Sequence, residues 1–194
     1  MTGGQGPGEG VHATAVLYGE SGVLILGPSG SGKSALALAL IAHARAAGQY
    51  GALIGDDRVW LRAAGGRIVA SGAPHMAGLI ERRGVGLLTA TNEPAAVIRL
   101  VVELNRPGEN WPRWPREPGD AALAGVLTPR LALNAAGAAA DHALSVVERL
   151  GAIRAERGEG RRFSLEQCAA VHKNRKLASL RKGFNDVRSP RPDE

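Results

Sequence analysis

The chain has 194 residues and a formal net charge of +6. Residues 149–194 hold 12 of the 24 Lys and Arg but only 6 of the 18 Asp and Glu, so the preceding residues are neutral and give no electrostatic reason to expect nucleic-acid binding. A single cysteine, Cys168, excludes an internal disulfide framework, and no apolar run approaches the roughly 18 residues of a membrane span. We therefore expect one domain in a reducing compartment, the cytoplasm, without membrane contact.

The first quarter of the chain predicts two short strands, a glycine-rich loop and a helix. Residues 1–10 are rich in glycine and predict a flexible leader. Apolar residues favour strands over 12–18 and 23–26, on either side of a turn. The loop 27–34 follows directly, and the Ala- and Leu-rich stretch after it predicts a helix that ends near Ala47.

The remaining elements are expected to alternate between strands and surface segments. A buried strand at 52–54 ends in two aspartates, and the segments 59–63 and 67–71 flank a glycine turn as a hairpin. In chain order, we further expect a loop at 74–86, an apolar strand at 95–104, an irregular surface loop at 105–120, an amphipathic helix at 136–150, a charged linker at 154–162 and a short capped helix from 164. The pattern predicts an α/β domain over 11–150 and a basic tail over 151–194.

The loop at 27–34 satisfies the pattern G-x-x-x-x-G-K-[ST] at every fixed position. A strand before it and a helix after it are the context that the pattern requires, and they argue against a glycine-rich turn that matches by chance. Lys33 is the only lysine before Lys173, and a compact ammonium suits a phosphate site better than arginine does. The sequence therefore predicts that a nucleoside triphosphate binds to Gly27, Pro28, Ser29, Gly30, Ser31, Gly32, Lys33 and Ser34, with the Ser34 hydroxyl holding Mg²⁺.

A phosphate loop alone does not name a reaction, because ATPases, GTPases and kinases share it. Asp56 and Asp57 follow a buried strand, and in a parallel α/β sheet that end faces the ligand. One carboxylate would accept a proton from a substrate hydroxyl while the other contacts Mg²⁺ or its waters. The alternative is an aspartate pair that merely begins a turn. Taken singly, His12 and the charged glycine loop at 79–88 are weaker signals.

Together these residues resemble the catalytic domain of the HPr kinase/phosphorylase family. The resemblance covers about residues 11–145 and rests on His12, the loop 27–34, Asp56-Asp57 and the segment Ile80-Glu81-Arg82-Arg83-Gly84-Val85-Gly86-Leu87. That family phosphorylates a serine of the phosphocarrier protein HPr, which regulates the phosphotransferase system, and can reverse the reaction with inorganic phosphate. The E-x-R-G-x-G segment is the specific element of the resemblance, and it implies a P-loop-containing kinase fold with a phosphoenolpyruvate-carboxykinase-like nucleotide-binding core.

The resemblance also implies a role for each matching residue. Asp56 matches the proton acceptor for the HPr serine, His12 a catalytic histidine, and Lys33 the phosphate-loop lysine. Ser34 and Glu81 match the Mg²⁺ ligands, and Arg113, with Arg116 as a competitor, matches a catalytic arginine. The signature loop needed for both directions of the reaction matches Ile80, Glu81, Arg82, Arg83, Gly84, Val85, Gly86, Leu87, Leu88 and Thr89. ATP and Mg²⁺ as cofactors, an HPr-like carrier as substrate and a homo-oligomer, a hexamer, follow from the same resemblance.

The chain departs from the family pattern in two places. It begins just before His12, so we expect a short form without the family's N-terminal domain. The segment 127–131 lacks the proline-glycine-arginine-asparagine run that the family uses for phosphorolysis, so kinase activity is expected and phosphorylase activity stays open. Two other functions also stay open: a non-catalytic module that senses ATP, and an accessory protein that binds nucleic acid through residues 149–194.

Overall fold

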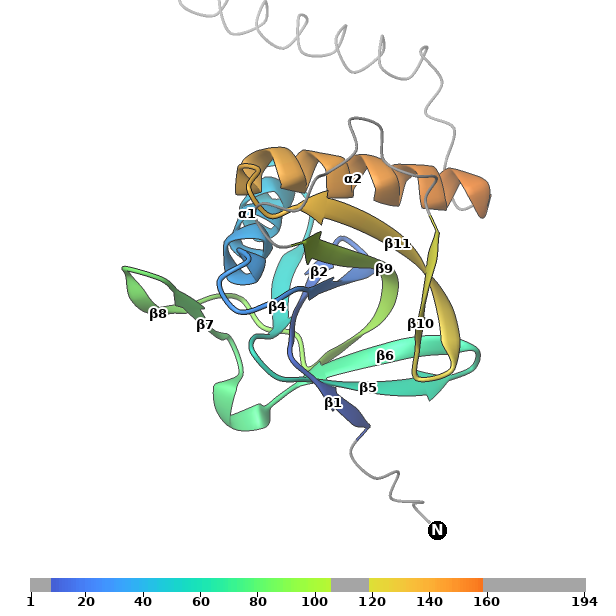
Figure 1. Cartoon of the computed structure of the whole chain (residues 1–194), viewed down its shortest axis with the longest axis horizontal. Coiled ribbons are helices and arrows are strands. Elements are labelled where there is room, and N and C mark those ends of the chain that lie inside the picture. The colour runs from blue at the N-terminus through green and yellow to red at the C-terminus, as the bar shows by residue number, and fades with distance from the viewer. Residues whose placement is uncertain (1–7, 106–118, 159–194) are drawn as a thin grey trace, which may run out of the picture. The chain divides into compact units, whose positions relative to one another are not determined.

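The structure, a computed structural model, describes residues 8–105 and 119–158 (Figure 1). The elements in these ranges are, in chain order, β1 (Glu9–Val11), β2 (Ala13–Tyr18), β3 (Ser21–Leu26), α1 (Lys33–Ala46), β4 (Gly51–Gly55), β5 (Val59–Ala64), β6 (Arg67–Gly72), a 3-10 helix (Pro74–Met76), β7 (Leu79–Arg82), β8 (Gly86–Thr89), β9 (Ala95–Asn105), β10 (Asp120–Leu123), β11 (Val126–Asn134) and α2 (Ala139–Glu156). They lie within one compact unit that ends at Glu156.

Strand β9 organises the main sheet, whose order is β1-β5-β6-β9-β3-β2-β4. One edge of β9 pairs with β3. Its other edge pairs first with β6, through residues 68–71, and then with β11, through residues 130–134. The sheet curls around this long strand, and Figure 1 shows α1 and α2 together on one side of it.

The strands that carry the phosphate loop and the aspartates point the same way. Strand β2 is antiparallel to β3 on one edge and to β4 on the other. Two antiparallel steps restore the chain direction, so the carboxyl ends of β3 and β4 lie at the same edge of the sheet. The sheet is therefore mixed, not parallel as the sequence suggested, yet it still brings the loop after β3 and the aspartates after β4 together.

The main sheet is buried on both faces by two hydrophobic clusters. One cluster lies between the sheet and the two helices and includes Val23 and Ile25 of β3. The other lies on the opposite face and includes Leu24 of the same strand. Because successive strand residues alternate between faces, β3 needs apolar side chains throughout, which explains its continuous apolar run in the sequence.

Most of the predicted elements are confirmed, with boundaries that differ by a few residues. The strands expected at 12–18, 23–26, 52–54 and 95–104 are β2, β3, β4 and β9, the expected hairpin is β5 with β6, and the helix after the loop is α1.

Other expectations about the elements were wrong. The segment 74–86 is not a loop, because it holds the 3-10 helix and β7, which pairs with β8 as a separate antiparallel hairpin. Residues 9–10, expected in the leader, belong to β1 and pair with β5. The helix expected at 136–150 continues to Glu156, through the expected domain boundary and into the expected linker. The hairpin of β10 and β11 was not predicted.

Parts of the chain lie outside the described residues. They include most of the expected loop at 105–120 and most of the basic tail. Among the helices of the described ranges, none is long and apolar enough to cross a membrane.

Candidate active site

The phosphate loop joins β3 to α1 through a backbone that needs its glycines. Gly30 and Gly32 have φ values of 78° and 97°, in the left-handed region that favours glycine. A Cβ at Gly27 would lie 2.6 Å from Ser31 Oγ and 2.8 Å from the carbonyl oxygen of Leu104. No side chain caps the N-terminus of α1, so its free N–H groups and the helix dipole favour an anion there.

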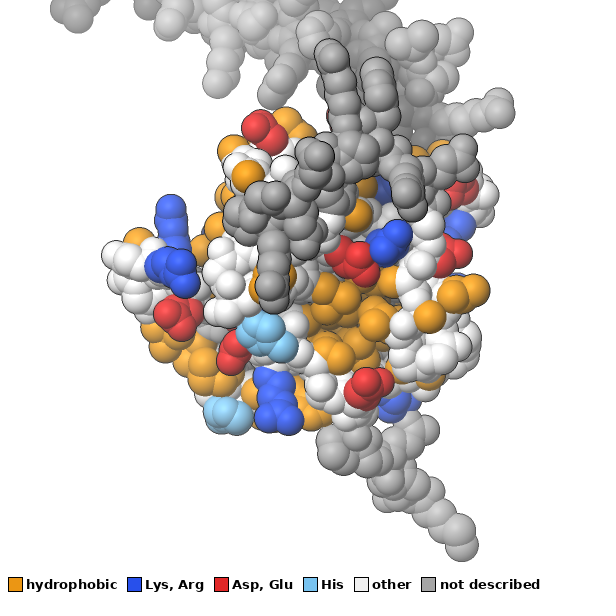
Figure 2. All heavy atoms as spheres, in the orientation of Figure 1, with side chains coloured by type: hydrophobic (Ala, Val, Ile, Leu, Met, Phe, Trp, Pro, Cys, Tyr) orange, Lys and Arg blue, Asp and Glu red, His pale blue; other side chains and the backbone are white. Residues whose placement is uncertain are grey.

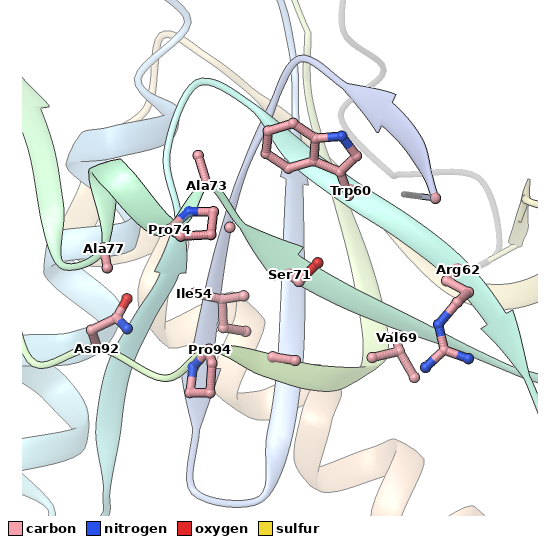
Figure 3. Close-up of a pocket in the computed structure, with 13 residues that line it drawn as sticks. Ile54, Trp60, Arg62, Val69, Ser71, Ala73, Pro74, Ala77, Asn92 and Pro94 are labelled. Carbon is pink, nitrogen blue, oxygen red and sulfur yellow. The ribbon is translucent and has the colours of Figure 1, made fainter. Parts of the chain in front are cut away.

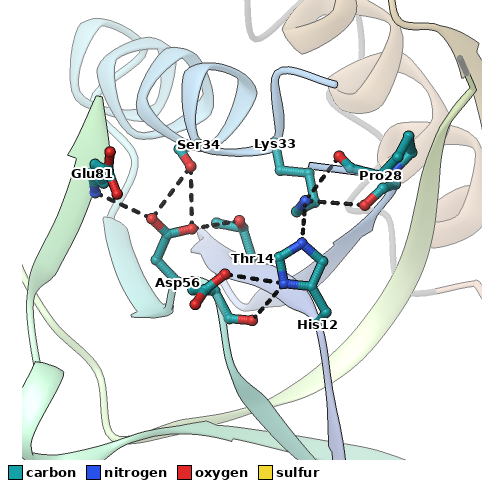
Figure 4. Close-up of polar contacts among 9 residues, drawn as sticks. His12, Thr14, Pro28, Lys33, Ser34, Asp56 and Glu81 are labelled. Atoms are coloured by element: carbon teal, nitrogen blue, oxygen red, sulfur yellow. Dashed lines mark hydrogen bonds and ion pairs between the residues drawn. The ribbon is translucent and has the colours of Figure 1, made fainter. Parts of the chain in front are cut away.

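Lys33, the first residue of α1, is buried, and all three of its ammonium donors have acceptors (Figure 4). Its Nζ lies 3.0 Å from His12 Nε2, 3.0 Å from the Gly27 carbonyl oxygen and 3.2 Å from the Pro28 carbonyl oxygen. Burial lowers the pKa of Lys33 below its ordinary value of 10.5, and the negative charges of the two aspartates after β4 oppose that decrease. The ammonium is thus aimed back at the loop that would surround the phosphates.

His12 connects Lys33 to Asp57. Its Nδ1 lies 3.0 Å from the Asp57 carboxylate and 3.1 Å from the Asp57 carbonyl oxygen. Both of these atoms are acceptors, so we assign the hydrogen to Nδ1, which leaves Nε2 to accept from Lys33. Asp57 has a φ of 64°, a left-handed conformation that aspartate tolerates better than most residues. The sequence suggested Asp57 as a contact for Mg²⁺ or its waters, and the structure shows it holding His12.

Asp56 is the acceptor for hydrogen bonds from three sides. Thr14 Oγ1 donates to Asp56 Oδ1 at 2.6 Å, and Ser34 Oγ lies 3.2 Å from both carboxylate oxygens. The backbone N–H of Glu81 donates to Oδ2 at 3.2 Å. Figure 4 shows the carboxylate between Ser34 at the start of α1, Thr14 on β2 and Glu81 on β7. The carboxylate is therefore held between the phosphate loop and the β7–β8 hairpin, which carries the signature segment 80–89.

A shift in strand register turns Asp56 toward this site. Val16 of β2 pairs with Leu53, but Ala15 pairs with Gly55, so one extra residue of β4 is accommodated between them. Such a bulge reverses the alternation of side chains beyond it. Without the shift, Asp56 would share the face of Ile54, in the cluster away from the helices. With the shift, it faces Thr14 and α1.

The surrounding cavity has a volume of about 530 Å³ and brings most of the predicted residues together. Its lining includes His12, Ser29, Gly30, Gly32, Lys33, Ser34, Asp56, Asp57, Met76, Glu81, Arg82, Arg83 and Leu87. A Cβ at Gly30 would lie 3.3 Å from a terminal nitrogen of Arg83, so this guanidinium adjoins the phosphate loop. The basic side chains on the projecting β7–β8 hairpin are visible at the left of Figure 2. The cavity is thus cationic where phosphates would lie and anionic beside it.

The donor set suits Mg²⁺ bound together with a nucleotide. Ser34 and Glu81, the residues predicted to hold Mg²⁺, both line the cavity, and both contact Asp56, Ser34 through its hydroxyl and Glu81 through its backbone N–H. Mg²⁺ prefers oxygen and commonly uses one or two protein ligands with phosphates and waters. Within the described ranges no group of three or more His, Cys, Asp or Glu is placed to hold a metal alone. The residues therefore fit a nucleotide-dependent ion better than a permanent metal centre.

Some site residues were predicted and others were not. Arg113 and its competitor Arg116 lie outside the described residues, so the structure does not place them. Sequence reasoning missed Thr14 on β2, although it lies only two residues after His12. It also missed Met76, on the 3-10 helix that was taken for a loop.

A second, more apolar cavity of about 860 Å³ lies on the other side of the 3-10 helix (Figure 3). Trp60, Val69, Pro74 and Pro94 line it, with Ser71 and Arg62 among the few polar side chains. The described residues that line it include no Asp or Glu and none of the phosphate loop. The chemistry of the molecule is therefore assigned to the smaller cavity.

Comparisons with known proteins agree with this site. Residues 7–126 match the family model described as HPr Serine kinase C-terminal domain. The chain is 36% identical over 100 residues to HPr kinase/phosphorylase of Mycoplasma mycoides subsp. mycoides SC, which covers 48% of this chain and 30% of that protein. It is 32% identical over 133 residues to HPr kinase/phosphorylase of Caldicellulosiruptor bescii, which covers 63% of this chain and 40% of that protein. The chain thus spans less than half the length of these curated relatives.

A solved structure, that of the Hpr(Ser) kinase/phosphatase from Coxiella burnetii, is similar in fold. It matches with a TM-score of 0.61 and 23% sequence identity, over 78% of this chain and 99% of that chain. This likeness confirms the expected α/β fold class.

Proposed function

Because the chain belongs to the family of HPr serine kinase C-terminal domains, we propose that it transfers the γ-phosphoryl group of ATP to a serine of an HPr-like carrier protein. The observation that carries this proposal is the placement of Asp56, a hydrogen-bonded carboxylate in the same cavity as Lys33 and the phosphate loop. A module that only senses ATP needs the loop but does not need a base beside it.

On the donor side, the loop amides and Lys33 would bind the phosphates of ATP. Ser34 and Glu81 would hold Mg²⁺, which supplies neutralisation of the charge that develops on the phosphates. Arg83, beside Gly30, adds a further positive charge near the loop. His12 keeps the Lys33 ammonium in place by accepting one of its hydrogens.

On the acceptor side, Asp56 would act as the general base. A serine hydroxyl is a weak nucleophile at neutral pH, and a positioned carboxylate assists it by taking its proton. The serine oxygen forms the new bond to the γ-phosphorus as the bond from that phosphorus to the β,γ-bridging oxygen breaks, and ADP leaves. Phosphorolysis would need Asp56 to return the proton while inorganic phosphate attacks the phosphoserine. The same proposal includes a cytoplasmic location, an HPr-like protein partner and a homo-oligomer, a hexamer.

The test is transfer from labelled ATP to purified HPr, with phosphoserine identified on the product. We expect Asp56→Asn to lower the transfer rate by at least about 100-fold, the usual contribution of a general base, while Mg-ATP still binds. Asp120→Asn, which changes an exposed carboxylate at the start of β10, serves as the matched control.

Full transfer by Asp56→Asn would overturn the assignment of the base. ATP binding by the wild-type protein without any phosphoprotein would instead favour the sensing module. A parallel reaction with phosphoserine-HPr and inorganic phosphate tests the reverse direction.

A further inference from the structure

We infer that Thr14 is a positioning residue for phosphoryl transfer, because its hydroxyl fixes the orientation of the Asp56 carboxylate. This inference rests on the proposed function and adds a residue that neither the sequence motifs nor the family resemblance assigns. It concerns the side chain of β2 that faces Asp56.

Thr14 carries a buried hydroxyl on a strand whose neighbouring side chains are apolar. The strand reads Ala-Thr-Ala-Val-Leu-Tyr, and the Thr14 residue is fully buried. A buried hydroxyl costs free energy unless it is hydrogen-bonded, and a valine would fill nearly the same volume without that cost. The partner that this hydroxyl has is charged: Oδ1 of Asp56, at 2.6 Å. Because a carboxylate only accepts, Thr14 is the donor.

The contact is built into the register of the sheet. Beyond the bulge Ala15 pairs with Gly55, so continuing the antiparallel register puts Thr14 opposite Asp56. Directly opposed residues of neighbouring strands have their side chains on the same face, about 5 Å apart at Cβ. The Thr14 side chain therefore contacts Asp56 from a strand of the sheet and not from a loop.

The other two donors to this carboxylate are less suited to orient it, because one is a proposed Mg²⁺ ligand and the other belongs to an exposed hairpin. Ser34 lies 3.2 Å from both oxygens, so it does not distinguish between them, and it is also the proposed Mg²⁺ ligand. The Glu81 amide belongs to the exposed end of the β7–β8 hairpin. Thr14 alone among these three donors is fully buried, and its short bond engages Oδ1 specifically. We therefore expect it to hold the carboxylate in one rotamer within the cavity.

The decisive comparison is Thr14→Val against Thr14→Ser in the full chain. We expect Thr14→Val to lower kcat for transfer to HPr by about 10- to 100-fold, the factor that a hydrogen bond to a charged group is worth. The KM for Mg-ATP should stay within about twofold, because Thr14 lies on β2, outside the loop that would bind the phosphates. Thr14→Ser keeps the donor and should recover most of the lost rate. A general packing defect would not separate these two variants in this way.

Two controls make the result interpretable. Ser21→Ala removes another buried hydroxyl, at the end of β3 away from the phosphate loop, where it accepts a hydrogen bond from Arg154. This change should leave kcat unchanged. Thr14→Ala gives the same loss of the hydroxyl if valine does not fold, since alanine already occupies both neighbouring positions. The inference is overturned if kcat in Thr14→Val stays within twofold of wild type, or if Val and Ser lower it equally. If the wild-type chain forms no phosphoprotein, the proposed function fails. If transfer survives Asp56→Asn, the assignment of the base fails together with this inference. If transfer needs Asp56 but not Thr14, only this inference fails.

Discussion

At the scale of single residues, the site depends on how one buried charge is satisfied. Lys33 has three donors on a compact ammonium, and the structure supplies an imidazole nitrogen and two loop carbonyls in the matching directions. A planar guanidinium could not reproduce this arrangement, which gives a geometric reason for a lysine in a region that otherwise uses arginine. Because phosphates compete with the carbonyls for the same donors, the ammonium can exchange partners without leaving its place.

A double-mutant cycle on His12 and Asp57 tests whether they act in series. Asp57 contacts His12, and His12 contacts Lys33, so Asp57 should influence ATP use through the histidine. We expect His12→Ala to lower kcat/KM for ATP by about 10- to 100-fold, the factor that a hydrogen bond to a charged group is worth, and Asp57→Ala to lower it less. The double variant should be no worse than His12→Ala alone. Multiplying effects would show instead that Asp57 acts separately, as a contact to the metal or its waters.

At the scale of elements, the bulge between β2 and β4 decides which face Asp56 occupies, and it lies against two glycines. A Cβ at Gly72 would lie 2.1 Å from the Ile54 carbonyl oxygen, and a Cβ at Gly55 would lie 2.8 Å from the Gly72 Cα. The end of β6 therefore runs directly over the bulged segment of β4. Any side chain at residue 72 must displace that segment, and with it the aspartate that follows.

Gly72→Ala should therefore impair catalysis from outside the cavity. We expect it to cost about 1–3 kcal/mol of unfolding free energy, as overpacking does, and to lower the rate of transfer to HPr. Gly151→Ala is the matched control, because Gly151 is an exposed position of α2 with open space around it. That change should raise stability by about 0.5–1 kcal/mol and leave transfer unaltered. Chemical denaturation and kinetics check both; a Gly72→Ala protein with normal stability and rate would contradict the proposed close packing.

The elements also show which parts of the fold the sequence could predict. Strands β2, β3 and β9 are buried on both faces and appear as apolar runs, and the phosphate loop is recognisable from its pattern. The sequence did not predict the β7–β8 hairpin, because Glu81, Arg82 and Leu87 are exposed and its strands lack the alternation that marks a half-buried strand. Gly84 lies in its turn and Gly86 begins β8, and these glycines were read as breaks in a loop.

The site was predictable in its membership but not in its geometry. Asp56, Lys33 and Glu81 are marked by motifs, and the structure places them around one cavity. The bond from Thr14 depends on the one-residue register shift, and nothing in the Ile54-Gly55 sequence reports that shift. Long-range pairing sets such details, and single-sequence patterns describe local structure only.

At the scale of the whole chain, both hydrophobic clusters and all the described site residues lie before residue 157. The excess positive charge lies mainly in the residues after that point. We therefore expect the unit that ends at Glu156 to fold without the residues after it.

A chain that ends after residue 158 should thus fold and bind nucleotide. We expect its thermal midpoint to stay within about 4 °C of the full chain, which corresponds to roughly 1 kcal/mol, and its Mg-ATP affinity to be unchanged. Calorimetry and equilibrium titration measure the two quantities. A large loss of stability would show that the later residues pack on the domain. Steeply salt-dependent binding of the full chain to DNA or RNA, absent from the shorter chain, would favour the accessory-protein alternative.

Strand β2 has one more consequence. It lies between β3, which leads into the phosphate loop, and β4, which leads into Asp56, so the loop and this carboxylate are two interstrand steps apart, each about 4.8 Å. Peptide hydrogen bonds set this spacing, and no side chain can change it by much. The surface segments around the cavity, above all the β7–β8 hairpin, are free of that constraint. Substitutions in those segments can therefore alter the surface that a protein substrate would meet while the spacing between the phosphate loop and Asp56 stays constant.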